Sequence, residues 1–282
     1  MTVELSTTKR LKQQLAAGRA IAAGAFVPFV ARLAEEAGYD AIYVSGAALS
    51  NSLGYRDEGV LPRSRVLDFT REVVRVVQLP VIVDVDTGFG GPKGVAETVR
   101  LFEDAGAAAI QIEDQDPRWK RCGHLEGKHL VSCQRMVEKL RAAVAAKRDH
   151  DFQIIARTDA VAVEGYEAAV ERARAYEAAG AGVLFPEALT SPDMFADFRS
   201  RVKAPLLANM TEFGKSPWIS DDDFVSMGYV IVIHPATTFR LAARAIEDAL
   251  AEMKRHGNQQ TLVESGKLMP RAEIDRYLIP NP

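Results

Sequence analysis

Cysteine is scarce in this sequence. Its 282 residues include only Cys122 and Cys133, and this pair lacks the spacing of a zinc finger. So few thiols in a chain of this length argue against a secreted scaffold held together by disulfides and indicate a reducing compartment. We therefore expect a cytoplasmic protein.

An excess of positive charge and long apolar runs are also lacking. Lys and Arg total 35 against 38 acidic residues, and the formal net charge is -3, so the chain as a whole does not attract nucleic acid or an anionic membrane. The apolar stretch 20–31 is interrupted by Gly24 and Pro28 and is too short to cross a bilayer. Residues 1–19 show no apolar core of a secretory signal. We expect no nucleic-acid partner and no membrane segment.

The sequence does contain a regular alternation of strand-like and helix-like segments. Short β-rich runs recur along the chain, each followed by an amphipathic stretch, as in βα units on a parallel sheet. The predicted strands span 21–27, 41–44, 81–85, 108–112, 153–156, 182–185, 205–208 and 229–233. The predicted helices span 28–37, 65–77, 94–105, 132–146, 166–179, 192–200, 221–226 and 237–256. This pattern predicts an α/β fold, a closed (β/α)8 TIM-type barrel.

The alternation runs without a linker. No low-complexity or Pro/Ser-rich stretch divides the chain, so we expect a single barrel domain over 1–282, with an N-terminal helix within 1–19. The tail 257–282 differs because it ends in the apolar run Tyr277-Leu278-Ile279. Such a run needs a partner surface, and we expect the tail to dock on the barrel or on a neighbouring subunit.

Polar residues follow nearly every predicted strand. In (β/α)8 enzymes the site is built at the C-terminal ends of the strands. Loops are wet in any fold, which explains part of this pattern, but it does not explain the density of carboxylates. The candidate residues at these ends are Ser45, Gly46, Ala47, Asp84, Asp86, Glu113, Arg157, Glu187, Asn209 and Thr211.

Two of these residues suggest a metal site. Asp84 and Asp86 are two positions apart on a segment expected to be extended, which would send both side chains to one face. With Glu113 from the next strand they form an acidic cluster, and oxygen ligands of this kind suit Mg²⁺ or Mn²⁺. Solvated or ion-paired aspartates are the alternative, and the presence of Glu113 favours a metal.

Two further features suggest catalysis on an anion. The planar guanidinium of Arg157 suits a substrate carboxylate, with a salt bridge to Glu113 or Glu187 as the competing interpretation. The run Lys120-Arg121-Cys122-Gly123-His124 places a thiol among cations, which favour the thiolate. A cysteine tuned in this way can donate or accept a proton, whereas an inert thiol in a solvated basic loop is the alternative.

Together these segments resemble the isocitrate lyase and phosphoenolpyruvate mutase superfamily. The resemblance rests on the 120–124 run, on 84–90 (Asp-Val-Asp-Thr-Gly-Phe-Gly) and on 112–115 (Ile-Glu-Asp-Gln). Within the superfamily, the segments 156–160, 184–188 and 209–214 are most similar to the 2-methylisocitrate lyases. The resemblance extends over about residues 23–271.

The resemblance implies a fold and an assembly as well as an activity. It implies a barrel whose last helix is swapped between subunits of a homo-oligomer, usually a dimer of dimers. It also implies Mg²⁺ held by Asp84 and Asp86, with Glu113 supporting the waters of the ion, and cleavage of 2-methylisocitrate to pyruvate and succinate by a carbon–carbon lyase. Cys122 would be the acid on a closing loop, tuned by His124 and Arg121.

A small di- or tricarboxylate substrate follows from the same resemblance. The residues implied to contact it are Ser45, Gly46, Ala47, Cys122, Gly123, Arg157, Glu187, Asn209, Thr211, Arg240 and Arg271. Ala47, Leu125, His234 and Ala236 depart from the usual residues of the family. Oxaloacetate and dialkylmalates therefore stay open as substrates, and a non-catalytic barrel that serves as a binding module is the alternative of a different class.

Overall fold

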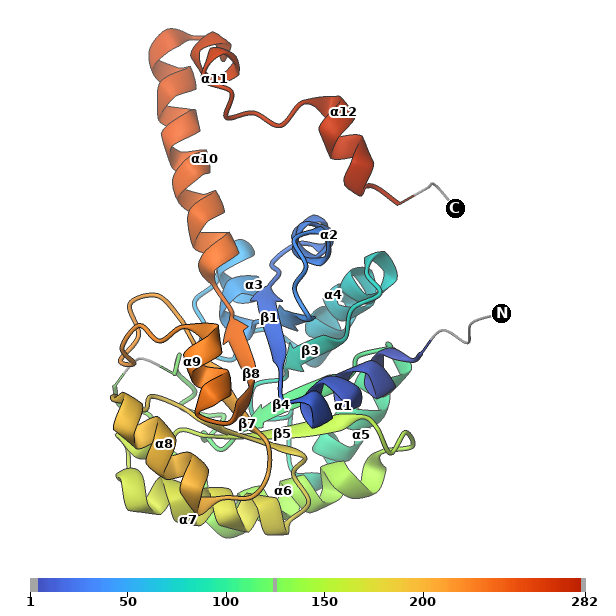
Figure 1. Cartoon of the computed structure of the whole chain (residues 1–282), viewed down its shortest axis with the longest axis vertical. Coiled ribbons are helices and arrows are strands. Elements are labelled where there is room, and N and C mark those ends of the chain that lie inside the picture. Colours follow the sequence, from blue (N-terminus) through green and yellow to red (C-terminus); the bar gives the residue numbers. More distant parts are fainter. Residues whose placement is uncertain (1–4, 124–125, 280–282) are drawn as a thin grey trace.

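The computed structural model describes residues 5–123 and 126–279. Its parallel strands close into a barrel in sequence order, and β8 pairs with β1, which confirms the predicted (β/α)8 fold (Figure 1). The strands are β1 (Ala20–Gly24), β2 (Ala41–Val44), β3 (Val81–Asp84), β4 (Ala109–Glu113), β5 (Gln153–Thr158), β6 (Val183–Pro186), β7 (Leu206–Asn209) and β8 (Tyr229–His234).

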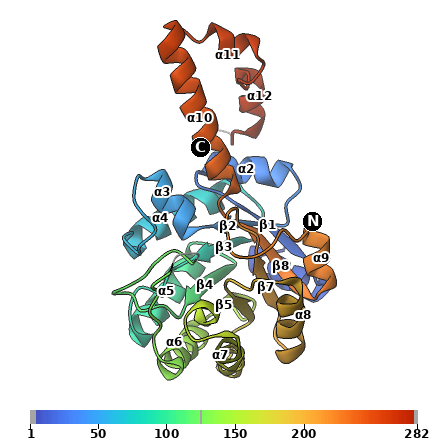
Figure 2. The ribbon, with the colours of Figure 1, turned by 90° about the vertical axis from the view of Figure 1, so that its left-hand side faces the viewer.

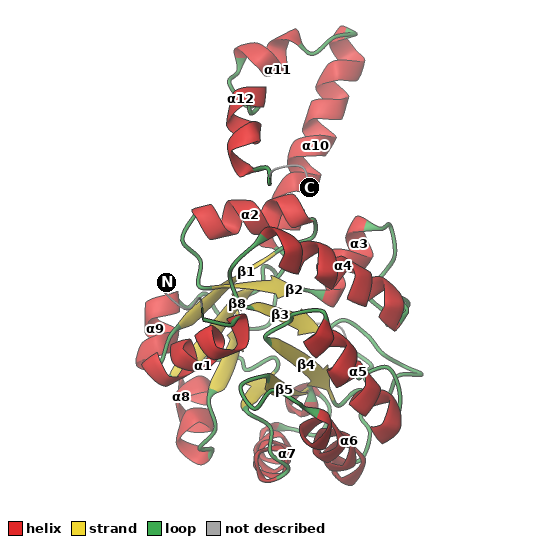
Figure 3. Cartoon of the chain, turned by 90° about the vertical axis from the view of Figure 1, so that its right-hand side faces the viewer, coloured by secondary structure: helices red, strands yellow, loops and turns green. Residues whose placement is uncertain are grey.

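Most of the helices surround the strands on the outside (Figure 3). The helices of the chain are α1 (Thr7–Ala17), α2 (Pro28–Glu36), α3 (Gly46–Ser52), α4 (Arg63–Val76), α5 (Pro92–Asp104), α6 (Cys133–Ala146), α7 (Tyr166–Ala178), α8 (Pro192–Arg201), α9 (Asp221–Ser226) and α10 (Thr237–His256), followed by α11 (Gln260–Glu264) and α12 (Arg271–Ile274). Short 3-10 turns lie at Ala160–Ala162 and Asp275–Tyr277. Within the described ranges, no helix is both long and apolar enough to pass through a bilayer.

The predicted boundaries differ from the observed ones in two instructive places. The first strand ends at Gly24 and not at residue 27, because Val27 is the extended N-cap of α2 and Pro28 occupies the first helical position, where the fixed φ of proline is favourable. The segment after β2 was expected only as a polar strand end. It forms α3, whose N-cap Ser45 accepts a hydrogen bond from the Ala48 amide.

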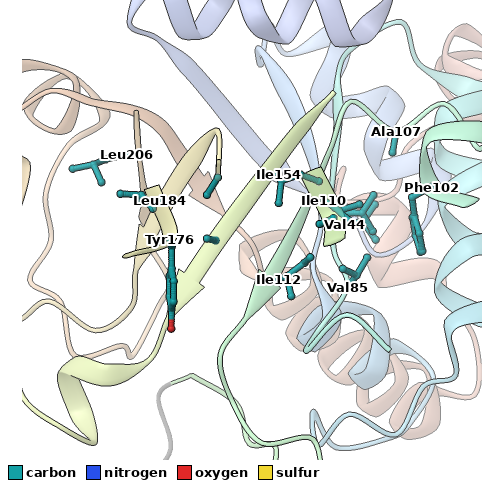
Figure 4. Packing of buried hydrophobic residues seen from close by; sticks show 14 of the residues in the cluster. Val44, Val85, Phe102, Ala107, Ile110, Ile112, Ile154, Tyr176, Leu184 and Leu206 are labelled. Carbon is teal, nitrogen blue, oxygen red and sulfur yellow. The ribbon is translucent and has the colours of Figure 1, made fainter. Parts of the chain in front are cut away.

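Side chains of each strand alternate between two apolar clusters. Outward-facing residues such as Ile110, Ile112 and Ile154 pack under the helices (Figure 4). Inward-facing residues such as Tyr43 and Ile155 fill the barrel, and Leu11 of α1 belongs to the same interior cluster. The period of two in a strand explains this division. The α1 helix therefore contributes to the interior of the barrel, consistent with the N-terminal helix expected from the sequence.

The inward-facing side chains become charged toward the C-terminal ends of β4 and β5. On β4, Gln111 and Glu113 face the same side of the strand as the inward-facing Ala109, and all three residues are buried. On β5, Arg157 faces the same side as the inward-facing Ile155. Glu113 and Arg157 are partners in the pairing of β4 with β5. The alternation that builds the core thus also delivers ionisable side chains to the interior of one barrel end.

The C-terminal helix α10 leaves the barrel (Figure 2). None of its residues is buried, and α11 and α12 turn back beside it (Figure 1). The end of the tail contacts α2, where Arg32 Nε donates to the Tyr277 carbonyl oxygen at 3.2 Å and the rings of Phe29 and Tyr277 are 6.0 Å apart. In the single chain the tail therefore docks on its own barrel, one of the two surfaces expected.

Candidate active site

A cavity of about 680 Å³ lies at the end of the barrel where the strands terminate. This volume is within the range of small-molecule sites. The residues expected from the sequence that line it are Ser45, Ala47, Asp84, Glu113, Cys122, Gly123, Arg157, Asn209, Thr211 and Arg240. The structure thus brings together residues from most of the strands, and the apolar part of the wall includes Phe185 and Phe239.

Gly46 lies where the two aspartates of the expected metal site converge. Its amide donates to Asp84 Oδ2 at 3.3 Å. A Cβ added at this glycine would lie 3.1 Å from Asp84 Oδ2 and 3.7 Å from Asp86 Oδ1. The absence of a side chain at Gly46 therefore leaves both carboxylates room.

The route by which Asp84 and Asp86 meet differs from the prediction. The sequence argument assumed an extended segment, but β3 ends at Asp84 and Asp86 has a φ of 50°, in the left-handed region that non-glycine residues seldom adopt. The Asp86 amide donates to Asp84 Oδ1 at 3.0 Å. A turn and not strand alternation places these carboxylates.

Lys120 brings a buried cation to these aspartates. Its side chain is only 4% exposed, and its Nζ forms ion pairs with Asp57 and, at 2.7 Å, with Asp86 Oδ1. Burial opposes the charge of Lys120, but Asp86, Glu113 and Asp57 outweigh it and raise the pKa of the lysine well above its usual value. Sequence reasoning missed both Lys120 and Asp57 as site residues. The position of Lys120 two residues before Cys122 was the available signal, whereas Asp57 lies in the connection between α3 and α4 and carries none.

Arg157 joins three carboxylates inside the barrel. Its Nε lies 3.0 Å from Asp159 Oδ2 and 3.5 Å from Glu113 Oε2, and its Nη2 lies 3.7 Å from Glu187 Oε2. The guanidinium also lies over the Phe185 ring, 5.1 Å from the ring centroid. The competing interpretation of Arg157 as an ion-pair partner therefore holds in the structure, although the residue also lines the cavity.

Gly123 allows the thiol loop to approach Arg157. A Cβ at Gly123 would lie 2.2 Å from Arg157 Nη2 and 3.1 Å from Glu187 Cδ, so a larger residue would push the loop away. The Gly123 carbonyl oxygen accepts from Lys128 Nζ at 2.6 Å, and the same Nζ donates to Asp159 Oδ1 at 2.7 Å. Lys128 and Asp159 thus tie the loop that carries Cys122 to the end of β5. His124 and Leu125 lie outside the described residues.

Among the remaining predicted residues, Asn209 and Arg240 line the cavity and Arg271 does not. Asn209 Nδ2 donates to Glu187 Oε2 at 3.3 Å, which connects Glu187 to the cavity wall. Arg240 Nε lies 3.4 Å from Glu212 Oε2. Arg271 does not reach this cavity in the single chain, because it lies on α12 with its side chain 94% exposed.

Carboxylates outnumber cations in this cluster of described residues. The carboxylates are those of Asp57, Asp84, Asp86, Glu113, Asp159 and Glu187, and the cations are Lys120, Lys128 and Arg157. Burial and the charge of Asp86 raise the pKa of Asp84 to about 6. Burial raises the pKa of Glu113 well above its usual value despite the opposing effect of Arg157. A further cation would relieve this surplus of negative charge.

The donor set fits a divalent cation that keeps part of its water shell. Asp86 Oδ1 and Glu113 Oε1 are buried and have no hydrogen-bond partner among the described residues, although Asp86 Oδ1 is ion-paired with Lys120. Over 5–123 and 126–279, no group of three or more His, Cys, Asp or Glu side chains is arranged to hold a metal alone. Mg²⁺ commonly binds through one or two carboxylates and retains several waters, so the pair Asp84 and Asp86 is compatible with this ion.

Comparison with known proteins agrees with the fold. The model of the phosphoenolpyruvate phosphomutase family matches residues 9–254. The chain belongs to this family. A relative from Aeropyrum pernix described as 2-methylisocitrate lyase is 54% identical over 254 residues, which is 90% of this chain and 81% of the relative.

Two solved structures of family members place the barrel among enzymes with different substrates. A 2,3-dimethylmalate lyase has a TM-score of 0.90 and 36% identity, and the match covers 97% of this chain and 91% of that one. A phosphonopyruvate hydrolase in complex with oxalate and Mg²⁺ has a TM-score of 0.86 and 31% identity, with coverage of 97% and 95%. Membership of the family alone therefore does not fix the substrate.

The buried cluster around Asp159 predicts a stability that depends on pH. Burial opposes its charge, but Arg157 and Lys128 outweigh burial and lower the pKa of Asp159 to about 2. A depressed pKa stabilises the fold above the ordinary value of about 4, and this contribution is lost as the pH falls from about 4 to about 2. Asp159→Asn should lose about 3–5 kcal/mol of the free energy of unfolding at pH 7, because buried Lys128 loses its carboxylate partner and Arg157 loses one of three.

Urea denaturation between pH 3 and pH 7 measures this effect. The loss caused by Asp159→Asn should shrink toward pH 3, because part of the wild-type contribution is already gone there. Asp248→Asn, at an exposed position on α10, is the matched control and should change little at any pH. If Asp159→Asn lost the same free energy of unfolding at every pH, the lowered pKa assigned to Asp159 would be wrong.

Proposed function

We propose that this chain is a Mg²⁺-dependent carbon–carbon lyase that cleaves 2-methylisocitrate to pyruvate and succinate. The 54% identity to a relative named 2-methylisocitrate lyase carries the choice of substrate. The cavity supports the chemistry, because Asp84, Glu113, the thiol loop and two arginines line it at one barrel end. The scarcity of cysteine supports a cytoplasmic location, and the slightly negative net charge argues against a nucleic-acid partner.

Asp84 and Asp86 would hold the Mg²⁺, with Glu113 beside them. When bound, the ion supplies Lewis acidity at the substrate hydroxyl and helps to orient the 2-hydroxy acid. The phosphonopyruvate hydrolase complex with oxalate and Mg²⁺ supports the choice of this ion. Mn²⁺ prefers the same oxygen ligands and would fit the same pair.

Arginine side chains would bind the carboxylates of the substrate. Arg157 and Arg240 line the cavity, and a guanidinium can bind both oxygens of a carboxylate. Ser45, Gly46 and Ala47 would contact the part of the substrate that becomes the keto acid, as the family resemblance implies. Glu187, Asn209 and Thr211 would contact the remainder, as the same resemblance implies. Asn209 and Thr211 line the cavity, and Asn209 Nδ2 donates to Glu187.

The chain has groups for both proton transfers of the cleavage. The hydroxyl proton would pass to Glu113, whose Oε1 is buried and has no hydrogen-bond partner in the described part of the chain. The bond between C2 and C3 then breaks, its electron pair stays on C3, and the hydroxyl oxygen becomes the carbonyl oxygen of pyruvate. The thiol of Cys122 would give its proton to C3 and complete succinate.

The proton-donor role makes Cys122 the most informative residue to replace. Cys122→Ala should lower kcat for 2-methylisocitrate by about 10²–10⁴-fold, because general acid catalysis contributes about this much, while KM changes little. Pyruvate release, coupled to lactate dehydrogenase, measures the rate. Cys133→Ala at the start of α6 is the matched control and should keep the wild-type rate. An unchanged kcat for Cys122→Ala would assign proton donation to another group.

A substrate panel tests the proposed function itself. In the presence of Mg²⁺, 2-methylisocitrate should be cleaved to pyruvate and succinate faster than isocitrate, oxaloacetate or 2,3-dimethylmalate. Activity should be lost on chelation and in Asp84→Asn. The similarity to a 2,3-dimethylmalate lyase makes that compound the second candidate, so preferential cleavage of it would replace the first proposal. A protein that binds but cleaves none of these compounds would be a binding module.

We also propose that α10 packs against a second copy of this chain in a homo-oligomer. Ile246, Leu250 and Met253 are 57%, 60% and 40% exposed, and their spacing places them on one face of the helix. A helix that leaves the barrel with an apolar stripe needs a covering surface. The swapped helix and the dimer of dimers implied by the family resemblance would supply one.

Charge in the apolar stripe should disrupt that assembly. The double variant Ile246→Glu and Leu250→Glu should shift the sedimentation coefficient in analytical ultracentrifugation toward the monomer, because carboxylates would have to be buried. Glu247→Lys alters charge at an exposed polar position of the same helix and should keep the wild-type assembly. A wild-type chain that sediments as a monomer at micromolar concentration would refute the helix swap.

A further inference from the structure

A second cavity, of about 610 Å³, lies beside the connection from β4 to α6. None of its lining residues lines the first cavity. Its wall includes Gly90, Gly91, Asp116, Arg118, Arg135 and Lys139. Its volume is suitable for a small molecule, and the proposed reaction makes no use of it.

Lys139 gives this cavity a buried positive charge. The residue is only 2% exposed, and its Nζ donates to the Thr87 carbonyl oxygen at 2.8 Å. No carboxylate in the described ranges forms an ion pair with it. A buried ammonium is costly when no counter-charge compensates it. Burial and the charge of Arg135 lower the pKa of Lys139, and the nearby carboxylates of Asp116, Glu113 and Asp114 oppose this effect only in part. An anion in the cavity would stabilise the charged form of Lys139.

Arg135 and Arg118 add positive charge to the same wall. Arg135 precedes Lys139 by four residues on α6, so the two side chains are neighbours of like charge, an arrangement that destabilises a helix unless it is compensated. Arg135 forms no ion pair with any other described residue, whereas Arg118 is paired with Asp116 at 2.6 Å. The lining thus contains three cations and one carboxylate.

The backbone of the wall also favours an anion. Gly91 is the N-cap of α5 and Ser132 is the N-cap of α6, and both residues line the cavity. Neither helix has an acidic side chain in its first turn. Helix N-termini attract negative charge, and they are frequent phosphate sites when cations accompany them. Here two N-termini and three cationic side chains share one cavity.

We propose that this second cavity binds a small phosphate-bearing anion. Several oxygens in a tetrahedral group could contact Lys139, the Arg135 guanidinium and the helix N-termini at the same time. The occupant would also touch two segments that lead to the first cavity. Lys139 Nζ donates a hydrogen bond to the carbonyl oxygen of Thr87, the residue after Asp86. Asp116 and Arg118 lie in the connection that continues to Lys120. Binding here would therefore be coupled to the position of the thiol loop.

Isothermal titration calorimetry with pyrophosphate, in the absence of Mg²⁺, tests this proposal independently of any catalytic activity. The double variant Arg135→Gln and Lys139→Met should raise the Kd by about tenfold or more, since each lost charge-assisted contact costs a substantial part of the binding free energy. Arg135→Gln alone changes an exposed residue and should still fold, and its Kd should rise by a smaller factor. Arg141→Gln on the same helix, outside the lining, is the matched control and should keep the wild-type Kd.

Two further arms locate the anion and define its chemistry. Arg240→Gln, in the first cavity, should leave pyrophosphate binding unchanged, whereas a comparable loss there would place the anion in the first cavity and overturn the proposal. Citrate should bind more weakly than pyrophosphate, and tighter binding of citrate would assign the site to carboxylates instead. Absence of pyrophosphate binding to the wild-type chain, or equal weakening by Arg141→Gln, would also overturn it.

Discussion

The pairing of buried opposite charges inside one end of the barrel is the constraint on which the rest of this site depends. Arg157 compensates Asp159, Glu113 and Glu187, and Lys120 compensates Asp57 and Asp86. Charges withdrawn from water are tolerated only when partners and hydrogen bonds replace the lost hydration. Each of these side chains therefore restricts where its neighbours can lie, and the cluster is held as a unit.

The same pairing explains how the loop that carries Cys122 can be held beside a charged cavity. Lys128 bridges the Gly123 carbonyl oxygen and Asp159, while Gln115 exchanges hydrogen bonds with the backbone of Arg121. The segment 120–123 is thus fastened to the ends of β4 and β5. Gly123 then permits close approach to Arg157, where a side chain would collide. The remaining surplus of negative charge supports the proposed binding of Mg²⁺, and Arg157 and Arg240 in the cavity lining support the proposed binding of a carboxylate substrate.

The second cavity and helix α10 each present groups that have no ion-pair partner or apolar cover within the described part of the chain. At the second cavity, Lys139 and Arg135 form no ion pair with a described carboxylate, and the anion proposed above would compensate their charge. On α10, the apolar stripe lacks a cover within the part of the chain described here. Both are features of the folded chain whose physical demands point to a further component, an anion in one case and a second copy of the chain in the other.

The amino-acid sequence by itself determined the barrel and most of the cavity wall. Strand alternation and helix periodicity are local properties, and because parallel strands end at the same edge of a barrel, residues such as Asp84, Glu113 and Arg157 could be placed together from their positions alone. Tertiary structure decided what local patterns cannot express. Asp57 comes from a distant connection to meet Lys120, Asp86 reaches Asp84 through a left-handed turn, and Arg157 is bound by three carboxylates. Arg271 lies on α12, away from the first cavity of the same chain. These outcomes depend on charge compensation and close packing between segments far apart in the chain, which no single segment encodes.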